Sequence, residues 1–310
     1  MRARSLAAAA ALAFSACTAQ NANGTHAAAV RTPSPRPSPA ATPFPPAVLL
    51  PGHRIVAYYG AADTPAMGVL GTGSIAQIEP KLLRQAAAYR KYGPVIPAFE
   101  LIAVEAQRDG GYDGAYSAGF DSSTVQRYVR AAAAMHGIVI LDIQPGRAAF
   151  LPLVKHYERF LRMPNVSLAL DSEWSMGPNE VPGDVIGGTD AATVNEVSAY
   201  LSDIVTRYRL PQKLLVVHQF TPDMIENRSQ VVQRPGLALV FHVDGFGDRP
   251  NKLSKYAILS RNAGPCVHGA QVVLRSGHRY VRSRRGDAAL AAPEFNNVPI
   301  APVSARSCRR

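Results

Sequence analysis

Four apolar runs in this sequence end in polar residues spaced two apart, and these residues could do acid–base chemistry. The runs end in Asp142-Ile143-Gln144, Asp171-Ser172-Glu173, His218-Gln219-Phe220 and His242-Val243-Asp244. Residues i and i+2 of a strand point to the same face, although His218 is paired with an aromatic residue and matches only in part. At the carboxyl ends of parallel strands, such groups would gather into a carboxylate-rich site.

The segment from Asp171 to Trp174 gives the sharpest indication of a reaction. Two carboxylates at the mouth of a barrel can act as acid and base, or as acid and nucleophile, in glycoside hydrolysis. Trp174, the only Trp of the chain, could stack on a sugar ring. Because Asp171 and Glu173 share one strand, Asp142 or Asp244 could supply the second catalytic group instead. The structural alternative is a strand end capped by loop amides, with Trp174 merely packing.

Other polar residues of the strands are candidates for substrate binding. Glu100 is an acid in an otherwise apolar run, where burial is costly unless the charge is paired. Tyr58 and Tyr59 end the first strand, and one of them, assigned to Tyr59, should face the pocket. The substrate-binding candidates are Tyr59, Glu100, Gln144, Trp174, His218, His242 and Asp244.

A metal centre is the less favoured interpretation of the same residues. Histidine and aspartate suit zinc and similar ions, so His218 and His242 could join the carboxylates around an ion. However, the sequence has no His-Glu-x-x-His and no close His pair, so we expect neither a metal nor a cofactor. A Gly-x-Ser-x-Gly elbow is also absent, and Cys266 and Cys308 lie outside the strand-like segments, which argues against Ser or Cys nucleophiles.

Strand-like and helix-like segments alternate from residue 53 onward. The expected strands span 54–60, 95–104, 138–144, 166–173, 213–220 and 237–244, and the expected helices span 77–92, 122–136, 150–162 and 191–209. Six such units in about 200 residues favour an α/β fold of the TIM-type (β/α)₈ barrel class over a doubly wound sheet. No Gly-x-Gly-x-x-Gly follows the first strand, which weakens the dinucleotide-binding alternative. Only 271–274 resembles a seventh strand, so the barrel is expected to be incomplete at its C-terminal end.

The formal net charge of +11 belongs to the two ends of the chain. Residues 1–50 carry four Arg and no acid, residues 261–310 carry nine Arg against two acids, and residues 51–260 balance 20 basic with 20 acidic residues. The central domain therefore has no electrostatic footprint for nucleic acid. We expect a monomer that does not bind nucleic acid.

The N-terminus predicts export. Arg2 and Arg4 precede a short apolar stretch that closes on Phe14-Ser15-Ala16-Cys17, which resembles a lipobox with Cys17 as the lipidated residue. An ordinary secretory signal is the alternative. We expect a protein held by a lipid at the outer face of the cytoplasmic membrane, or else secreted.

The expected organisation has four parts. Residues 1–17 form the signal peptide, 18–52 a Pro-rich disordered tether, 53–260 the barrel domain and 261–310 a basic irregular tail. The tail has three open interpretations: a natural basic tail, an arm that binds RNA or the cell wall, or an out-of-frame end.

The strand ends together resemble a family of exported actinobacterial lipoproteins. The matching segments are Ala57-Tyr58-Tyr59-Gly60, Pro97–Ala103, Leu141–Gly146, Leu170–Trp174, Val217–Phe220 and Phe241–Gly245. The resemblance covers roughly residues 54–260 and implies a secreted barrel similar to glycoside hydrolases. Members of that family continue with further strand-like segments where this chain has its basic tail.

These observations predict an envelope-anchored, carbohydrate-active barrel that hydrolyses cell-wall or capsular glycan. Glu173 would be the acid/base and Asp171 or Asp142 its partner, with His218 and Asp244 orienting the substrate. A non-catalytic barrel that binds envelope glycan or a protein, and a metal-dependent hydrolase, remain alternatives.

Overall fold

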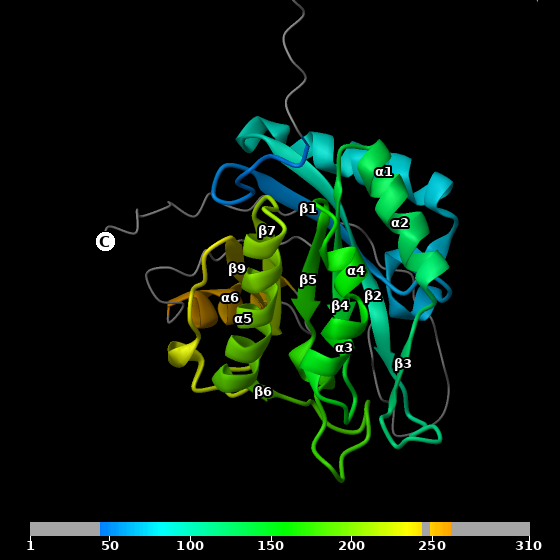
Figure 1. The fold of residues 1–310 in the computed structure, drawn as a ribbon, viewed down its shortest axis with the longest axis vertical. Helices are drawn as coiled ribbons and strands as arrows, with labels where there is room; N and C mark the ends of the chain where they lie inside the picture. Colours follow the sequence, from blue (N-terminus) through cyan, green and yellow to red (C-terminus); the bar gives the residue numbers. More distant parts are fainter. Residues whose placement is uncertain (1–43, 244–248, 262–310) are drawn as a thin grey trace, which may run out of the picture. The chain divides into compact units, whose positions relative to one another are not determined.

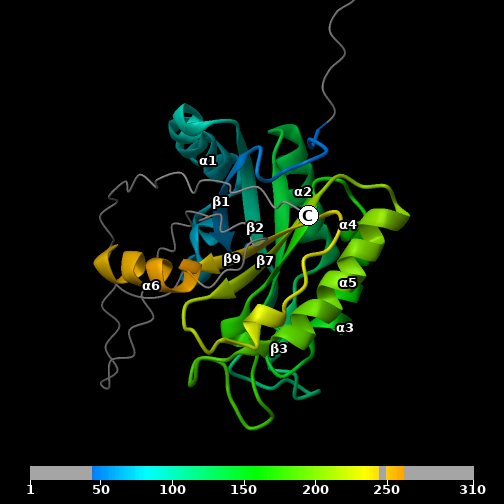
Figure 2. The same cartoon turned by 90° about the vertical axis from the view of Figure 1, so that its left-hand side faces the viewer.

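Six parallel strands form one curled sheet, and each strand lies beside the strand that precedes it in this set (Figures 1 and 2). The strands are β1 Arg54–Gly60, β2 Val95–Ala106, β4 Ile138–Ile143, β5 Val166–Leu170, β7 Lys213–Gln219 and β9 Leu237–Val243. A doubly wound sheet reverses its strand order at a switch point, and this order has no reversal. The sheet is therefore singly wound, as the strands of a barrel are.

The computed structural model describes residues 44–243 and 249–261, all within one compact unit spanning Thr42–Arg310. The described strands form part of a barrel and not a closed ring of eight. The predicted signal peptide, most of the tether, the seventh strand at 271–274 and the basic tail lie outside the described residues. The end of the predicted disordered tether, residues 44–52, instead packs on the domain: Leu49 and Leu50 are buried, and their N–H groups donate to Gln212 Oε1 (2.8 and 3.0 Å).

Helices α1 to α5 pack against one face of the sheet (Figure 1). The helices are α1 Ile75–Tyr89, α2 Ser122–Ala134, α3 Phe150–His156, α4 Glu158–Leu161, α5 Ala191–Arg207 and α6 Arg249–Arg261. Short 3₁₀ helices span Pro65–Met67, Val69–Thr72, Arg90–Tyr92, Ser172–Trp174 and Arg228–Gln230. Within the described ranges, no helix has the length and apolar character needed to cross a membrane.

Aspartate caps start two of these helices. A carboxylate oxygen of Asp121 accepts hydrogen bonds from the backbone N–H groups of Ser123 (2.7 Å) and Thr124 (3.0 Å) at the start of α2. Asp190 accepts one from Thr193 N–H (2.7 Å) at the start of α5. Such caps satisfy N–H groups that have no partner inside the helix. Both helices begin where the sequence predicts.

Three elements differ from the prediction or are added to it. The predicted helix over 150–162 is divided at Tyr157, whose buried hydroxyl donates hydrogen bonds to the carbonyl oxygens of Ala103 (2.6 Å) and Phe120 (3.3 Å). The fourth strand ends at Leu170 and not at Glu173, because a 3₁₀ turn follows. Helix α6 was not expected.

Three short strands lie in the connections between the longer strands. β3 Ser117–Gly119 pairs antiparallel with the end of β2. β6 Thr189–Asp190 and β8 Ile225–Glu226 form a separate two-stranded parallel sheet. These strands lie in the long connections that follow β2, β5 and β7.

Alternation along the strands separates two hydrophobic cores. The residues that face the helices, such as Phe99, Leu141 and Val217, join the larger core. The other face, called here the inner face, carries a smaller core. That core consists of Leu49, Leu50, Ile55, Ala57, Ile96, Ala98, Ile138, Ile140, Ala169, Leu214, Val216, Ala238 and Val240. Its four alanines leave little volume, which suits the narrow interior of a curled sheet.

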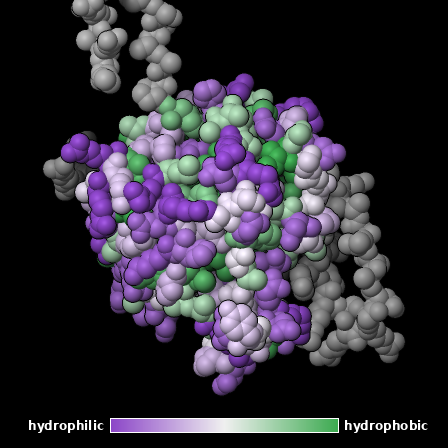
Figure 3. Space-filling view, turned by 45° about the vertical axis from the view of Figure 1, so that its right-hand side comes forward, coloured by the Kyte–Doolittle hydropathy of each residue, from purple (hydrophilic) through white to green (hydrophobic). Residues whose placement is uncertain are grey.

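One face of the molecule is predominantly polar. On the face shown in Figure 3, hydrophilic residues predominate and apolar residues form small separate patches. Such scattered apolar residues are normal for a protein surface and indicate no particular partner.

Lys213 is a fully buried amine at the start of β7. Its Nζ donates hydrogen bonds to the carbonyl oxygens of Met163 (2.8 Å) and Val166 (2.6 Å). Burial lowers the pKa of Lys213 from 10.5 to about 7. These hydrogen bonds link the start of β7 to the turn after α4 and to the first residue of β5.

The substitution Lys213→Met should change how stability depends on pH. Between about pH 7 and 10.5 the unfolded chain binds a proton that the folded chain does not, so the native protein gains stability as the pH rises. We expect the free energy of unfolding of the wild type, relative to the variant, to increase by up to a few kcal/mol across this window. Urea denaturation at several pH values measures it. Lys81→Met, on the exposed surface of α1, is the control and should keep the pH dependence of the wild type. If the free energy of unfolding were equally independent of pH in both variants, Lys213 would not be a buried neutral amine.

Candidate functional site

A layer of polar residues continues the inner face beyond its apolar core. Each of these residues follows an apolar inner-face residue by two positions. Five of them lie at or just beyond the carboxyl end of their strand, whereas Glu100 lies midway along the longer β2. They are Tyr59 after Ala57, Glu100 after Ala98, Asp142 after Ile140, Asp171 after Ala169, His218 after Val216 and His242 after Val240. The period of two predicted from sequence therefore brings groups from all six strands to one layer.

His218 lies among three carboxylates. Its Nε2 is 3.2 Å from Glu100 Oε1 and 3.4 Å from Asp142 Oδ2, and its Nδ1 is 3.6 Å from Asp171 Oδ1. The imidazole side chain is 3% exposed and the three carboxylates are 0% exposed. The ring of His242 packs edge-on against it, with 4.8 Å between centroids. We call these five residues the buried cluster.

Gln144 and Tyr59 hold Asp171 from the other side. Gln144 Nε2 donates to Asp171 Oδ2 (3.2 Å) and to the Tyr59 hydroxyl (3.0 Å), and that hydroxyl donates to the same Asp171 oxygen (3.2 Å). Gln144 Oε1 accepts a hydrogen bond from the Ala106 N–H (3.0 Å). The Gln144 amide is thereby fixed in orientation, and two donors suit an Asp171 that carries negative charge.

The electrostatic field of the cluster acts on Tyr59. Burial, followed by the negative charges of Asp142, Asp171, Glu173 and Glu100, raises the pKa of the Tyr59 phenol well above 10. The phenol therefore stays neutral and keeps its proton for hydrogen bonding.

The cluster holds more acid than its imidazoles balance. Three carboxylates contact one imidazole, and burying a charge without compensation is very costly. Among the described residues, Glu100 Oε2 has no hydrogen-bond partner, although it is fully buried. Protons on the carboxylates, a protonated His218 or a bound cation are the available ways to reduce this cost.

Glu173 lies outside the cluster but near it. Because the strand ends at Leu170, Asp171 and Glu173 are not neighbours on an extended strand, and the predicted shared-face geometry for this pair is wrong. Glu173 and Trp174 are half-buried in the 3₁₀ turn, and the Glu173 charge still reaches the Tyr59 phenol. Asp244 and Cys17, two further predicted residues, lie outside the described part of the chain.

A hollow of about 740 Å³ opens beside the 3₁₀ turn and was not predicted. Ser175, next to Trp174, lines it together with Thr189 and Gly188, and four acids also reach it. These acids are Asp190, Glu196, Asp223 and Glu226. None of them was singled out from the sequence, and the hollow itself depends on packing between connections distant in sequence.

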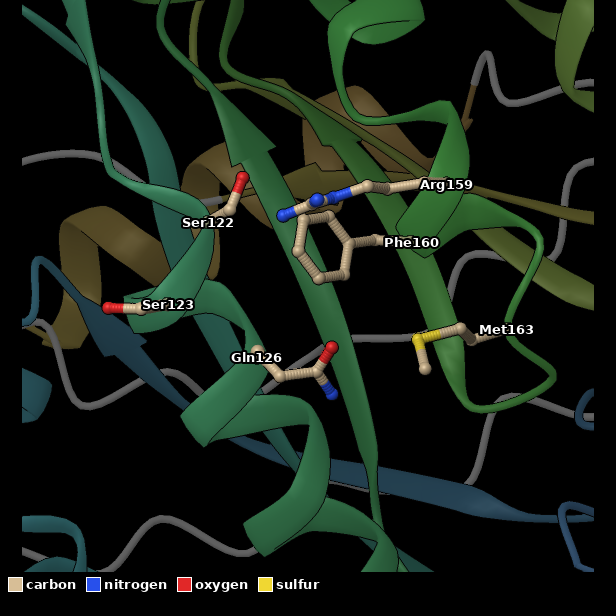
Figure 4. A pocket seen from close by; sticks show the side chains of 6 residues that line it. All are labelled: Ser122, Ser123, Gln126, Arg159, Phe160 and Met163. Atoms are coloured by element: carbon tan, nitrogen blue, oxygen red, sulfur yellow. The ribbon is translucent and has the colours of Figure 1, made fainter.

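A second hollow, of about 330 Å³, lies between α2 and the α4 segment. Figure 4 shows Ser122, Ser123 and Gln126 on one side, and Arg159, Phe160 and Met163 on the other. Its lining includes no residue of the buried cluster and no acid. It carries no candidate chemistry.

Comparison with known proteins adds no relative. No protein-family model matches this chain, and no curated protein matches it. The geometry of the site is therefore the basis for inferring function.

The substitution Gln144→Leu should destabilise the protein. It removes the acceptor of the Ala106 N–H and a donor to Asp171 while nearly keeping the side-chain volume, so we expect a loss of about 2–4 kcal/mol in the free energy of unfolding. Chemical denaturation measures the loss. Gln126→Leu, on the half-buried surface of α2, should change stability by no more than about 0.5 kcal/mol. Equal effects of the two variants would show that the Gln144 hydrogen bonds contribute nothing.

Proposed function

We propose that this chain is an envelope-anchored (β/α)₈-type barrel protein that hydrolyses cell-wall or capsular glycan. The observation that carries the proposal is the gathering of carboxylates and hydrogen-bonding groups from six parallel strands at one layer of the inner face. Active sites of (β/α)₈ barrels are built at this end of the strands. Two further strands would complete the ring.

Glu173 is the proposed general acid/base. It is half-buried in the 3₁₀ turn, two residues before Ser175, which lines the 740 Å³ hollow, whereas the carboxylates of the buried cluster are fully enclosed. A glycosidic oxygen that reached Glu173 would receive its proton from this side chain. Partial burial suits an acid that must hold a proton until a substrate arrives.

Asp171 is the proposed partner of Glu173. The Tyr59 hydroxyl and the Gln144 amide both donate to its Oδ2, which favours a negatively charged carboxylate in a fixed orientation. Because Asp171 is fully buried, its charge would act through space on the positive charge that develops on the sugar ring. Asp142, on the next strand of the layer, is the alternative partner.

His218 and His242 act in this proposal as positioning residues. Both are almost fully buried, so contacts with the carboxylates fit them better than contacts with a glycan. His218 would hold Asp171 through Nδ1 while its Nε2 faces Glu100 and Asp142.

The hollow is the proposed glycan-binding groove. Its volume falls in the range of small-ligand pockets, and its hydroxyls, carboxylates and backbone groups suit sugar hydroxyls. Trp174 precedes the lining residue Ser175 and would supply the stacking surface. A lipid at Cys17 and the Pro-rich tether would hold the groove near the envelope glycan.

The substitution Glu173→Gln should abolish hydrolysis. Loss of an acid/base of this kind lowers the rate by about 10²–10⁴-fold. Release of reducing sugar from a panel of cell-wall and capsular glycans measures the rate for the full chain and the variant. Glu79→Gln, on α1, is the matched control and should leave the rate unchanged.

A non-catalytic glycan-binding barrel is the second candidate, because the carboxylates of the cluster itself are fully buried. Folded wild type that binds a glycan of the panel but releases no sugar would overturn the hydrolase and support binding. Equal activity of the wild type and Glu173→Gln would remove Glu173 from the reaction.

A further inference from the structure

We propose that Glu100, His218 and His242 bind one divalent transition-metal ion, such as Zn²⁺. One ligand atom from each of these residues lies within 4.8 Å of the others. The site does not depend on glycan hydrolysis and uses fully buried residues of the cluster.

The pairing of two neighbouring strands brings together two histidines that are distant in the sequence. His218 of β7 and His242 of β9 are 24 positions apart in the chain, but the parallel register places them directly opposite each other. Their rings meet at an angle of 77°, with 4.8 Å between centroids. The absence of a local His-x-x-x-His pattern therefore does not exclude a site with two imidazoles.

The distances fit a coordination shell. Ligands bonded at 2.0–2.1 Å in a tetrahedron lie about 3.3–3.4 Å apart. His218 Nε2 is 3.2 Å from Glu100 Oε1, close to that spacing. A ligand atom of His242 lies within 4.8 Å of ligand atoms of both residues, so a small inward shift would bring all three to one ion.

Charge and hydrogen bonding give an independent reason for a cation. Tyr59 and Gln144 donate hydrogen bonds to Asp171, whereas the fully buried Glu100 carboxylate faces His218. A dication would offset the negative charge that Glu100, Asp142 and Asp171 together bring to the cluster. Glu100 Oε2, fully buried and without a hydrogen-bond partner in the described structure, is a lone-pair donor in the same place.

The donor set selects the class of ion. Imidazole nitrogen together with carboxylate oxygen suits Zn²⁺, Fe²⁺ and similar ions, whereas Ca²⁺ and Mg²⁺ prefer oxygen ligands alone. A site with two His and one or two carboxylates also leaves room for a water or another exogenous ligand.

Zinc titration of the full chain, stripped with a chelator and followed by isothermal calorimetry, tests the site. We expect one equivalent of Zn²⁺ to bind saturably and to raise the thermal midpoint. Glu100→Gln and His242→Ala should each weaken that binding by at least about 100-fold, since loss of even an outer-shell partner costs 10–100-fold. His156→Ala, on the exposed surface of α3, is the control and should keep the affinity.

Circular dichroism of the stripped variants shows that each is folded, and Glu100→Gln keeps the shape of the side chain if His242→Ala does not fold. No saturable binding by folded wild type would overturn the site. So would equal zinc affinity in the wild type, Glu100→Gln and His242→Ala, because the ion would then bind elsewhere on the chain. Neither result depends on sugar release, so failure of the glycan assay leaves this test intact.

Discussion

The burial of three carboxylates around one imidazole is the constraint on which the rest of the structure depends. Such charges can be enclosed only if donors and countercharges arrive from several directions. Here they arrive from six consecutive strands, because a singly wound sheet curls its inner face around the cluster. The alanines and aliphatic residues of the smaller core continue the same face, and Tyr59 and Gln144 donate hydrogen bonds to Asp171. The strand order, the curl of the sheet and the smaller core therefore all help to enclose the cluster.

Much of this arrangement could be predicted from the sequence, because it depends on local alternation. The first strand has the bounds that its apolar pattern indicates, and Asp121 marks the start of α2. The period of two also placed Asp142 and Gln144 on one face, and their contacts with His218 and Asp171 agree with it. These predictions succeed because neighbouring residues alone determine which face a strand side chain takes.

The rest depends on contacts between residues distant in the chain. The strand ends at Leu170 because the following backbone turns, which the apolar-polar pattern of Asp171 to Glu173 does not reveal. Tyr157 divides a predicted helix through hydrogen bonds to carbonyl groups 37 and 54 positions away. Glu100 reads as one unusual acid in an apolar run, and only strand pairing shows that it meets His218, 118 positions later. No local pattern encodes such encounters.

The enclosed cluster is difficult to explain as a device for stability. Apolar side chains of similar volume would fill the same layer without the desolvation cost of three carboxylates, and replacing buried ionic groups in this way often leaves a protein equally or more stable. The ionisable groups that fill this layer of the inner face therefore point to a chemical role. The residues differ in exposure: Glu173 is half-buried in the 3₁₀ turn, whereas Glu100, His218 and His242 are fully enclosed. A glycan could reach the former, but only a proton or a small ion fits the latter, so the two halves of the layer suit different ligands.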